Sequence, residues 1–191
     1  MLSQFKPSIE KRLQGLVAYF KWINPNALTL IGIIPQALFF YFMYNHQFVA
    51  AAIALVFSCI DMLDGLVARA TNKVSAFGAF LDSTLDRISD FLVIAGFYYA
   101  GLINLELFLV LLGSTYLISY ARARAELASN NTIRFDQGLI ERPERIIFLL
   151  IVLVIEIVSP DNSWVRLLIL ILTTLSIVTF FQRVWAAYKK L

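Results

Sequence analysis

The sequence is poor in charged residues and in the residue types that build loops and disulfide scaffolds. Of its 191 residues only 15% are charged, 8 are Gly, 5 are Pro, and Cys59 is the single cysteine. An ordinary soluble domain has about 25% charged residues, so this composition excludes a soluble globule. It also excludes a disordered, collagenous or disulfide-stapled chain. The single histidine, His46, lies between the first two apolar stretches and far from the acidic residues described below.

Apolar residues are abundant and fall into long runs. They make up 60% of the chain, against about 45–50% in a soluble domain. A helix needs about 20 mostly apolar residues to cross a bilayer. Six stretches meet or approach this length, namely Ala27–Tyr44, Phe48–Ala70, Phe77–Leu102, Leu107–Ala128, Arg142–Val158 and Trp164–Tyr188. The expected fold class is therefore all-α, a polytopic membrane bundle of six transmembrane helices.

The basic residues predict how this bundle is oriented. Residues 2–22 have apolar side chains at helical spacing and basic ones between them, which indicates an amphipathic helix in the membrane interface. Residues 24–188 form the bundle, and residues 1–191 are expected to be a single membrane domain. With six spans, all Lys and Arg residues except Arg166 fall on the side of the termini. The positive-inside rule then puts both termini on the cytosolic side of the cell membrane.

Aspartates gather at the cytosolic ends of the second and third stretches. Residues that share one helical face are Asp61, Asp64 and Gly65 on the second stretch, and Gly78, Asp82 and Asp86 on the third. The short polar segment Thr71–Ser75 can turn the chain between them, so the two faces can meet. Carboxylates at membrane depth are costly, and neighbouring ones cannot all ionise without compensation. A divalent cation supplies that compensation, and oxygen ligands favour Mg²⁺ or Mn²⁺.

These residues match a known signature. The pattern Asp61-x-x-Asp64-Gly65-x-x-Ala68-Arg69, followed after eight residues by Gly78-x-x-x-Asp82-x-x-x-Asp86, resembles the complete motif of the CDP-alcohol phosphotransferases. Those enzymes are six-helix membrane proteins, usually dimers, that displace CMP from a CDP-linked alcohol. The resemblance implies that two Mg²⁺ or Mn²⁺ ions bind at Asp61, Asp64, Asp82 and Asp86, and that Asp86 is the catalytic base. It also implies that the CDP-lipid contacts Asn26, Ala27, Leu28, Thr29, Gly65, Arg69 and Ser75.

Arginines in the second half of the chain narrow the choice of acceptor. They occur in the segments Tyr120–Glu126 and Ile140–Arg145 and at Arg183. Because Arg binds phosphate in a bidentate manner, these residues favour an acceptor that carries its own anion. The segments are similar to the phosphatidylinositol phosphate and archaetidylinositol phosphate synthases. This resemblance implies CDP-diacylglycerol or CDP-archaeol as the donor and myo-inositol 1-phosphate as the acceptor, whose phosphate is held by Arg122, Arg145 and Arg183.

Other functions stay open on the sequence alone. A sister enzyme of the same family could use glycerol 3-phosphate, serine or CDP-inositol. A more distant alternative is a divalent-cation transporter, which would need acidic residues that are reachable from both sides of the membrane. Membrane lipids and a second copy of the chain are the expected partners, and no nucleic-acid partner is expected.

Overall fold

The computed structural model describes residues 25–58, 75–135, 137–160 and 162–191. These residues form six helices, and no strand occurs among them. The chain divides into two compact units, Met1–Gly96 and Phe97–Leu191. The predicted amphipathic helix at 2–22 lies outside the described residues, as does the predicted span Phe48–Ala70 from residue 59 onward.

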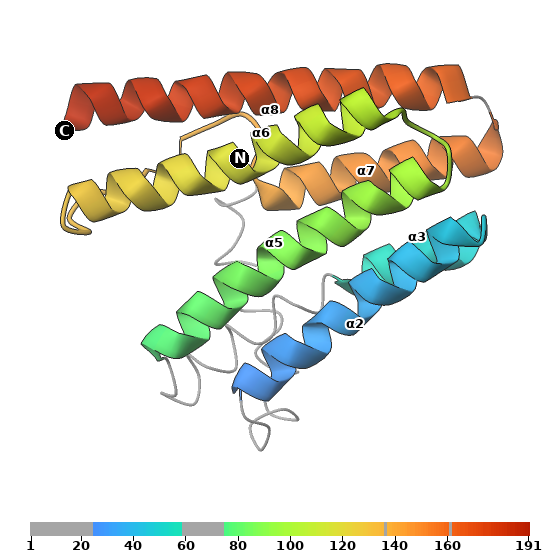
Figure 1. Ribbon diagram of the computed structural model, residues 1–191, viewed down its shortest axis with the longest axis horizontal. Coiled ribbons are helices and arrows are strands. Elements are labelled where there is room, and N and C mark those ends of the chain that lie inside the picture. Colours follow the sequence, from blue (N-terminus) through green and yellow to red (C-terminus); the bar gives the residue numbers. More distant parts are fainter. Residues whose placement is uncertain (1–24, 59–74, 136, 161) are drawn as a thin grey trace, which may run out of the picture. The chain divides into compact units, whose positions relative to one another are not determined.

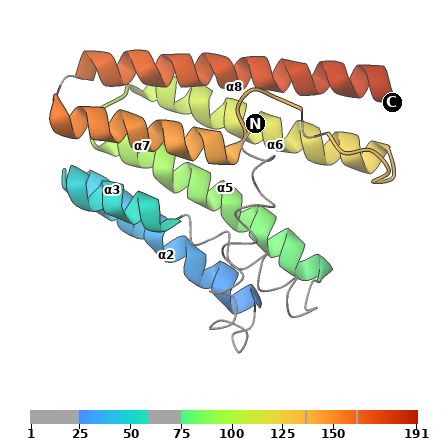
Figure 2. The same cartoon turned by 180° about the vertical axis from the view of Figure 1, so that it is seen from behind.

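The first unit contains α2 (Pro25–Tyr44), α3 (Phe48–Phe57) and nearly all of α5 (Ala76–Tyr99). Helices α2 and α3 pack against each other and run in opposite directions (Figures 1 and 2). Small residues of α3, Ala51 and Ala54, are buried, and such residues let helix backbones approach closely where lipid gives no hydrophobic drive for association.

Helices α2 and α5 run in the same direction, with their starts and their ends close together. A Cβ atom at Gly96 would lie 2.7 Å from Phe39 Cε1 and 3.2 Å from Met43 Cβ. At the other end, a Cβ at Gly78 would lie 3.0 Å from Asn26 Oδ1. The first turn of α5 therefore lies beside the first turn of α2, as predicted if both helices begin at the same membrane face.

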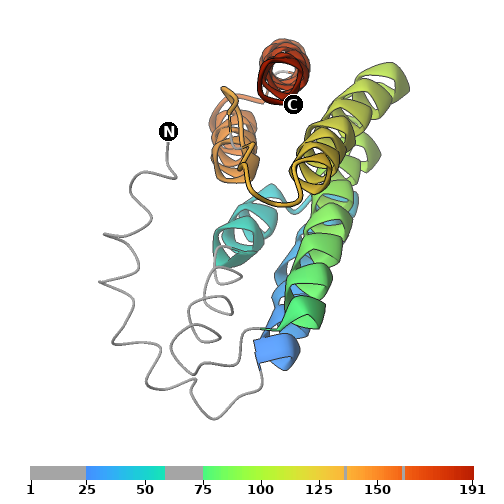
Figure 3. The same cartoon turned by 90° about the vertical axis from the view of Figure 1, so that its left-hand side faces the viewer.

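The second unit contains α6 (Leu105–Ala128), α7 (Arg142–Val158) and α8 (Asn162–Lys190). Helix α8 packs against both α6 and α7, as the end-on view in Figure 3 shows. Hydroxyls on the buried sides of α6 and α8 donate to carbonyls of their own helix, such as Ser114 to Leu111 O (2.9 Å) and Ser176 to Leu172 O (2.8 Å). These buried hydroxyls therefore need no polar partner on a neighbouring helix.

Apart from the partly described second span, the helix limits lie within two residues of the predicted spans, except at the end of the third. The fifth span is confirmed at both ends, and α2, α6 and α8 begin two residues before the predicted spans. The third was predicted to reach Leu102, which is wrong, because α5 ends at Tyr99. Gly101 has a φ of +75°, and the N–H groups of Gly101 and Leu102 donate to Tyr98 O (2.9 Å) and Phe97 O (3.1 Å). This Schellman cap ends the helix although the sequence remains apolar.

Three of the helices are long and apolar enough to cross a membrane on length and composition. They are Asn26–Tyr44, Leu105–Ala128 and Ser163–Lys190. Helix α5 has charged residues in its first half, α7 has 17 residues, and only part of the second predicted span is described. The all-helical membrane fold is confirmed, whereas the count of six spans stays a prediction.

Candidate active site

The first turn of α5 brings three predicted site residues together. Ser75 precedes the helix, and its Oγ accepts a hydrogen bond from the N–H of Gly78 (3.0 Å). A Cβ at Gly78 would lie 3.1 Å from this Oγ and 3.0 Å from Asn26 Oδ1. Ser75 is therefore the N-cap of α5, and Gly78 leaves room for the polar atoms of Ser75 and Asn26 on the same side of the helix.

The remaining predicted CDP contacts on α2 are less accessible. Leu28 and Thr29 are buried, and Ala27 is half-buried. The first backbone N–H groups of any helix have no partner within it and attract anions. The start of α2 can therefore contribute backbone donors from Asn26 to Leu28, while the side chain of Leu28 packs inside the unit.

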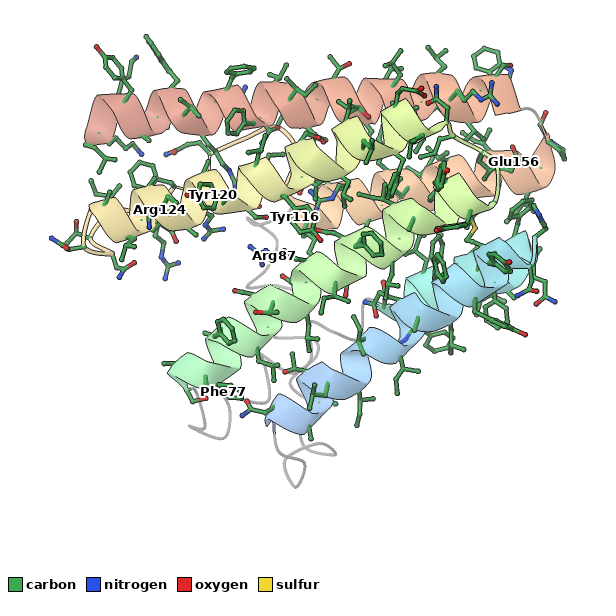
Figure 4. The ribbon with its side chains drawn as sticks, viewed as in Figure 1. Phe77, Arg87, Tyr116, Tyr120, Arg124 and Glu156 are labelled. Carbon is green, nitrogen blue, oxygen red and sulfur yellow. The ribbon has the colours of Figure 1, made fainter. Side chains whose placement is uncertain are left out.

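The acidic residues of α5 lie on one stripe that begins at Gly78. Asp82 is exposed, and the side chain of Asp86 is 22% exposed, with Oδ2 4.0 Å from Arg87 Nη1. Figure 4 shows Phe77 at the start of this helix and Arg87 farther along it. Asp90, one turn beyond Asp86, is buried. Asp90 lies outside the signature motif, which ends at Asp86.

The other half of the predicted metal site belongs to the second predicted span. Asp61, Asp64, Gly65 and Arg69 lie outside the described residues. Within the described ranges no three His, Cys, Asp or Glu side chains converge. The four-aspartate metal site therefore stays a prediction, of which Asp82 and Asp86 are the described part.

The predicted acceptor arginines have different environments. Arg145 and Arg183 are buried, with 3% and 5% of their surface exposed. Arg122 is 41% exposed at its side chain, and its Nε donates to Glu126 Oε1 (2.9 Å). Figure 4 shows Tyr116, Tyr120 and Arg124 following one another along α6, and all three are exposed.

Arg183 is held by two backbone carbonyls and a carboxylate. Its Nε donates to Gln137 O (3.1 Å), its Nη1 donates to Ile118 O (3.0 Å), and its Nη2 lies 3.6 Å from Glu141 Oε1. These partners come from α6 and from the segment that precedes α7. The guanidinium group is thus held from several sides, at the predicted cytosolic end of the unit.

Two glutamates near these arginines, Glu141 and Glu144, form the capping box of α7, in which Glu144 Oε2 accepts a hydrogen bond from the N–H of Glu141 (3.2 Å). Glu141 also faces Arg183. Another buried acid, Glu156, lies near the far end of α7 (Figure 4). Glu156 is a single acid within an apolar run and belongs to no sequence motif.

The comparisons with known proteins assign this chain to a family. The sequence model of the family described as CDP-alcohol phosphatidyltransferase matches residues 22–185. An archaetidylinositol phosphate synthase of Pyrococcus horikoshii is 42% identical over 195 residues, which cover 100% of this chain and 98% of that protein.

Solved structures of a phosphatidylinositol phosphate synthase of Mycobacterium tuberculosis have the same fold. The crystal structure with CDP-DAG bound has a TM-score of 0.76 and 29% identity, and the match covers 95% of this chain and 92% of that one. The structure of the same enzyme with manganese and citrate also has a TM-score of 0.76 and 29% identity, with 95% and 88% covered. The chain therefore belongs to the CDP-alcohol phosphatidyltransferase family.

Proposed function

We propose that this protein transfers the phosphatidyl or archaetidyl group from a CDP-linked lipid to myo-inositol 1-phosphate and releases CMP. The observation that carries the proposal is the identity, along the whole chain, to an enzyme named archaetidylinositol phosphate synthase. The buried Arg145 and Arg183 support it, because the planar guanidinium group of arginine matches the oxygens of a phosphate. The whole chain acts as one membrane domain.

The donor is CDP-diacylglycerol or CDP-archaeol, bound by residues of the first unit, Gly65 and Arg69 among them. Ser75 accepts the N–H of Gly78 and keeps its own hydroxyl proton for a further acceptor, such as a pyrophosphate oxygen. The first turn of α2, from Asn26 to Thr29, offers backbone donors to the same ligand. The crystal structure of the mycobacterial enzyme with CDP-DAG supports this assignment.

The metal ligands are Asp61, Asp64, Asp82 and Asp86, which bind two Mg²⁺ or Mn²⁺ ions. Asp82 and Asp86 suit these ions, because both are hard oxygen donors on one helix face and neither is fully buried. The manganese complex of the mycobacterial enzyme agrees with this choice. When bound, the ions supply positive charge that neutralises the pyrophosphate oxygens.

Asp86 acts as the general base. Its carboxylate takes the proton of an inositol hydroxyl, and the hydroxyl oxygen forms a bond to the β-phosphorus of the CDP-lipid. The bond between this phosphorus and the oxygen of the α-phosphate breaks, so that CMP leaves with that oxygen. Arg122, Arg145 and Arg183 bind the phosphate of the acceptor, and Arg suits this role because its planar guanidinium matches phosphate oxygens.

The reaction takes place at the cytoplasmic face of the cell membrane, and the active protein is a homodimer. The CDP-lipid reaches the site from the bilayer, whereas inositol 1-phosphate is water-soluble and arrives from the cytosol. The excess of Lys and Arg on the side of the termini supports this orientation.

The acceptor can be identified by measuring CMP release. Purified protein in mixed micelles with CDP-diacylglycerol and Mg²⁺ is given inositol 1-phosphate, free inositol, glycerol 3-phosphate or serine in separate reactions. We expect CMP release with inositol 1-phosphate and little with the other three. Release with glycerol 3-phosphate or serine alone would assign the protein to a sister activity of the family.

Gly78→Ala is expected to weaken CDP-lipid binding. The new methyl would lie 3.0 Å from Asn26 Oδ1 and 3.1 Å from Ser75 Oγ, so both side chains would have to move. We expect the KM for the CDP-lipid to rise on the order of tenfold, which corresponds to about 1.4 kcal/mol, with little change in the KM for the acceptor.

The matched control for this variant is Gly113→Ala on α6. A Cβ at Gly113 would meet no heavy atom within 4 Å, so its kinetics should equal those of the wild type. Equal KM values for the CDP-lipid in Gly78→Ala and in the wild type would contradict a donor site at the start of α5.

A further inference from the structure

The five residues before α7, residues 137–141, lie against α8 and are called the strap below. The N–H of Ile140 donates to Thr179 Oγ1 (3.1 Å), and Thr179 is fully buried. Gly138 has a φ of +155°, and a Cβ at this position would clash with Thr179 Cγ2. Only glycine fits this contact, so Gly138 and Thr179 fix the position of the strap on α8.

The strap holds Arg183 at two of its nitrogen atoms. Gln137 O accepts a hydrogen bond from Nε, and Glu141 Oε1 lies 3.6 Å from Nη2. On the other side of the guanidinium, Ile118 O accepts from Nη1 (3.0 Å). A long side chain that would otherwise populate many rotamers is therefore held in one orientation.

Glu141 lies beside Arg183 and also contacts the backbone of Arg145. Its backbone carbonyl accepts the N–H of Arg145 (3.0 Å), and its own N–H donates to Glu144 Oε2. Glu141 thus stands at the start of α7 with its carboxylate toward α8. A displacement of Glu141 changes the surroundings of both buried arginines.

We propose that the strap is a positioning element for the acceptor phosphate, in which Gly138, Thr179 and Glu141 fix the guanidinium of Arg183 relative to Arg145. The proposal rests on the proposed function, in which both arginines bind that phosphate. Glu141 and Gly138 are positioning residues that act through Arg183. A binding group held in place before the ligand arrives loses less conformational freedom on binding, and the affinity is correspondingly higher.

Gly138→Ala tests the contact between the strap and α8. The clash with Thr179 Cγ2 and the positive φ both displace the strap, and we expect the KM for inositol 1-phosphate to rise on the order of tenfold or more. The KM for CDP-diacylglycerol should stay the same. Thr179→Ser removes the clashing methyl and keeps the hydroxyl that accepts the N–H of Ile140. The double variant Gly138→Ala/Thr179→Ser should therefore recover part of the lost affinity.

Glu141→Gln tests the charge that faces Arg183 and leaves the backbone contacts of the strap in place. We expect a smaller increase in the KM for inositol 1-phosphate, with the KM for CDP-diacylglycerol unchanged. The matched controls are Glu106→Gln, at the exposed start of α6, and Gly113→Ala, and both should behave like the wild type.

The kinetic constants separate the possible outcomes. A strap that only stabilises the fold would lower the melting temperature and the amount of active enzyme and would leave both KM values unchanged in Gly138→Ala. Unchanged KM values in Gly138→Ala would overturn the strap proposal. An equal rise of both KM values in that variant, or no recovery of affinity in the double variant, would overturn it as well. In each of these cases the wild type would still release CMP with inositol 1-phosphate, so the proposed function would stand. A wild type that releases no CMP with inositol 1-phosphate would overturn the proposed function and the strap proposal together.

Discussion

Replacing Asp86 by asparagine is expected to lower kcat for CMP release by about three orders of magnitude, as is typical when a general base is lost. Asparagine has nearly the same shape and still offers one oxygen ligand, but it cannot take the proton of the attacking hydroxyl. The side chain of Asp86 is 22% exposed on the α5 stripe and does not lie in a packed core. The substitution should therefore leave the melting temperature almost unchanged.

Asp82→Asn separates loss of the base from loss of a metal ligand. Asp82 lies one turn before Asp86 on the same face and is exposed. Its replacement removes one charged ligand, so the Mg²⁺ concentration needed for half-maximal activity should rise, and excess Mg²⁺ should restore most of kcat. Excess Mg²⁺ should not restore Asp86→Asn. If the two variants respond alike to Mg²⁺, Asp86 is a metal ligand without a role as base.

The helices could be predicted where the sequence carries both an apolar run and an end signal. Helix α7 begins at Arg142 and ends at Val158, as predicted, because Glu141 and Glu144 form its cap and Pro143 suits the first turn. The apolar pattern predicts an end of α5 that is three residues too late. Leu102 and Ile103 are apolar and buried, but they lie beyond the Schellman cap at Gly101. An apolar residue at a span end can pack as well in a turn as in a helix.

In the candidate site, too, the local features can be predicted from the sequence and the long-range contacts cannot. The stripe of Gly78, Asp82 and Asp86 follows from helical spacing alone, which is a local property. The contacts of Arg183 with Gln137 O and Ile118 O join residues that are 46 and 65 positions apart in the chain. Backbone carbonyls are present at every residue, so the sequence gives no sign of which ones a buried arginine will reach.

The strap cannot be predicted from the sequence, as Gly138 illustrates. A single glycine in a polar connection usually indicates a turn, and the spacing to Thr179 carries no periodic signal. Glycine is required at position 138 because φ is +155° and because a Cβ there would clash with the methyl group of Thr179. Only the three-dimensional packing of the strap on α8 creates that constraint.

Arg145→Ala is expected to raise the KM for inositol 1-phosphate on the order of 100-fold and to leave the KM for the CDP-lipid within about twofold. A hydrogen bond to a charged group contributes about 1.5–3 kcal/mol, and about 1.4 kcal/mol corresponds to a factor of ten. Arg145 is 3% exposed, so truncation also leaves a cavity. Arg145→Lys keeps the charge and most of the volume but loses the planar pair of donors, and its KM should lie between those of the wild type and the alanine variant.

Kinetics with free inositol test whether the rise in KM in Arg145→Ala comes from a lost contact with the phosphate of the acceptor. The wild type should prefer inositol 1-phosphate to inositol strongly, because the arginines bind only the phosphorylated acceptor. In Arg145→Ala this preference, measured as the ratio of the two kcat/KM values, should fall by the same factor as kcat/KM for inositol 1-phosphate. If both acceptors lose equally, Arg145 supports the fold of α7 and does not bind the phosphate. A selective loss for the phosphorylated acceptor identifies Arg145 as a residue that distinguishes inositol 1-phosphate from inositol.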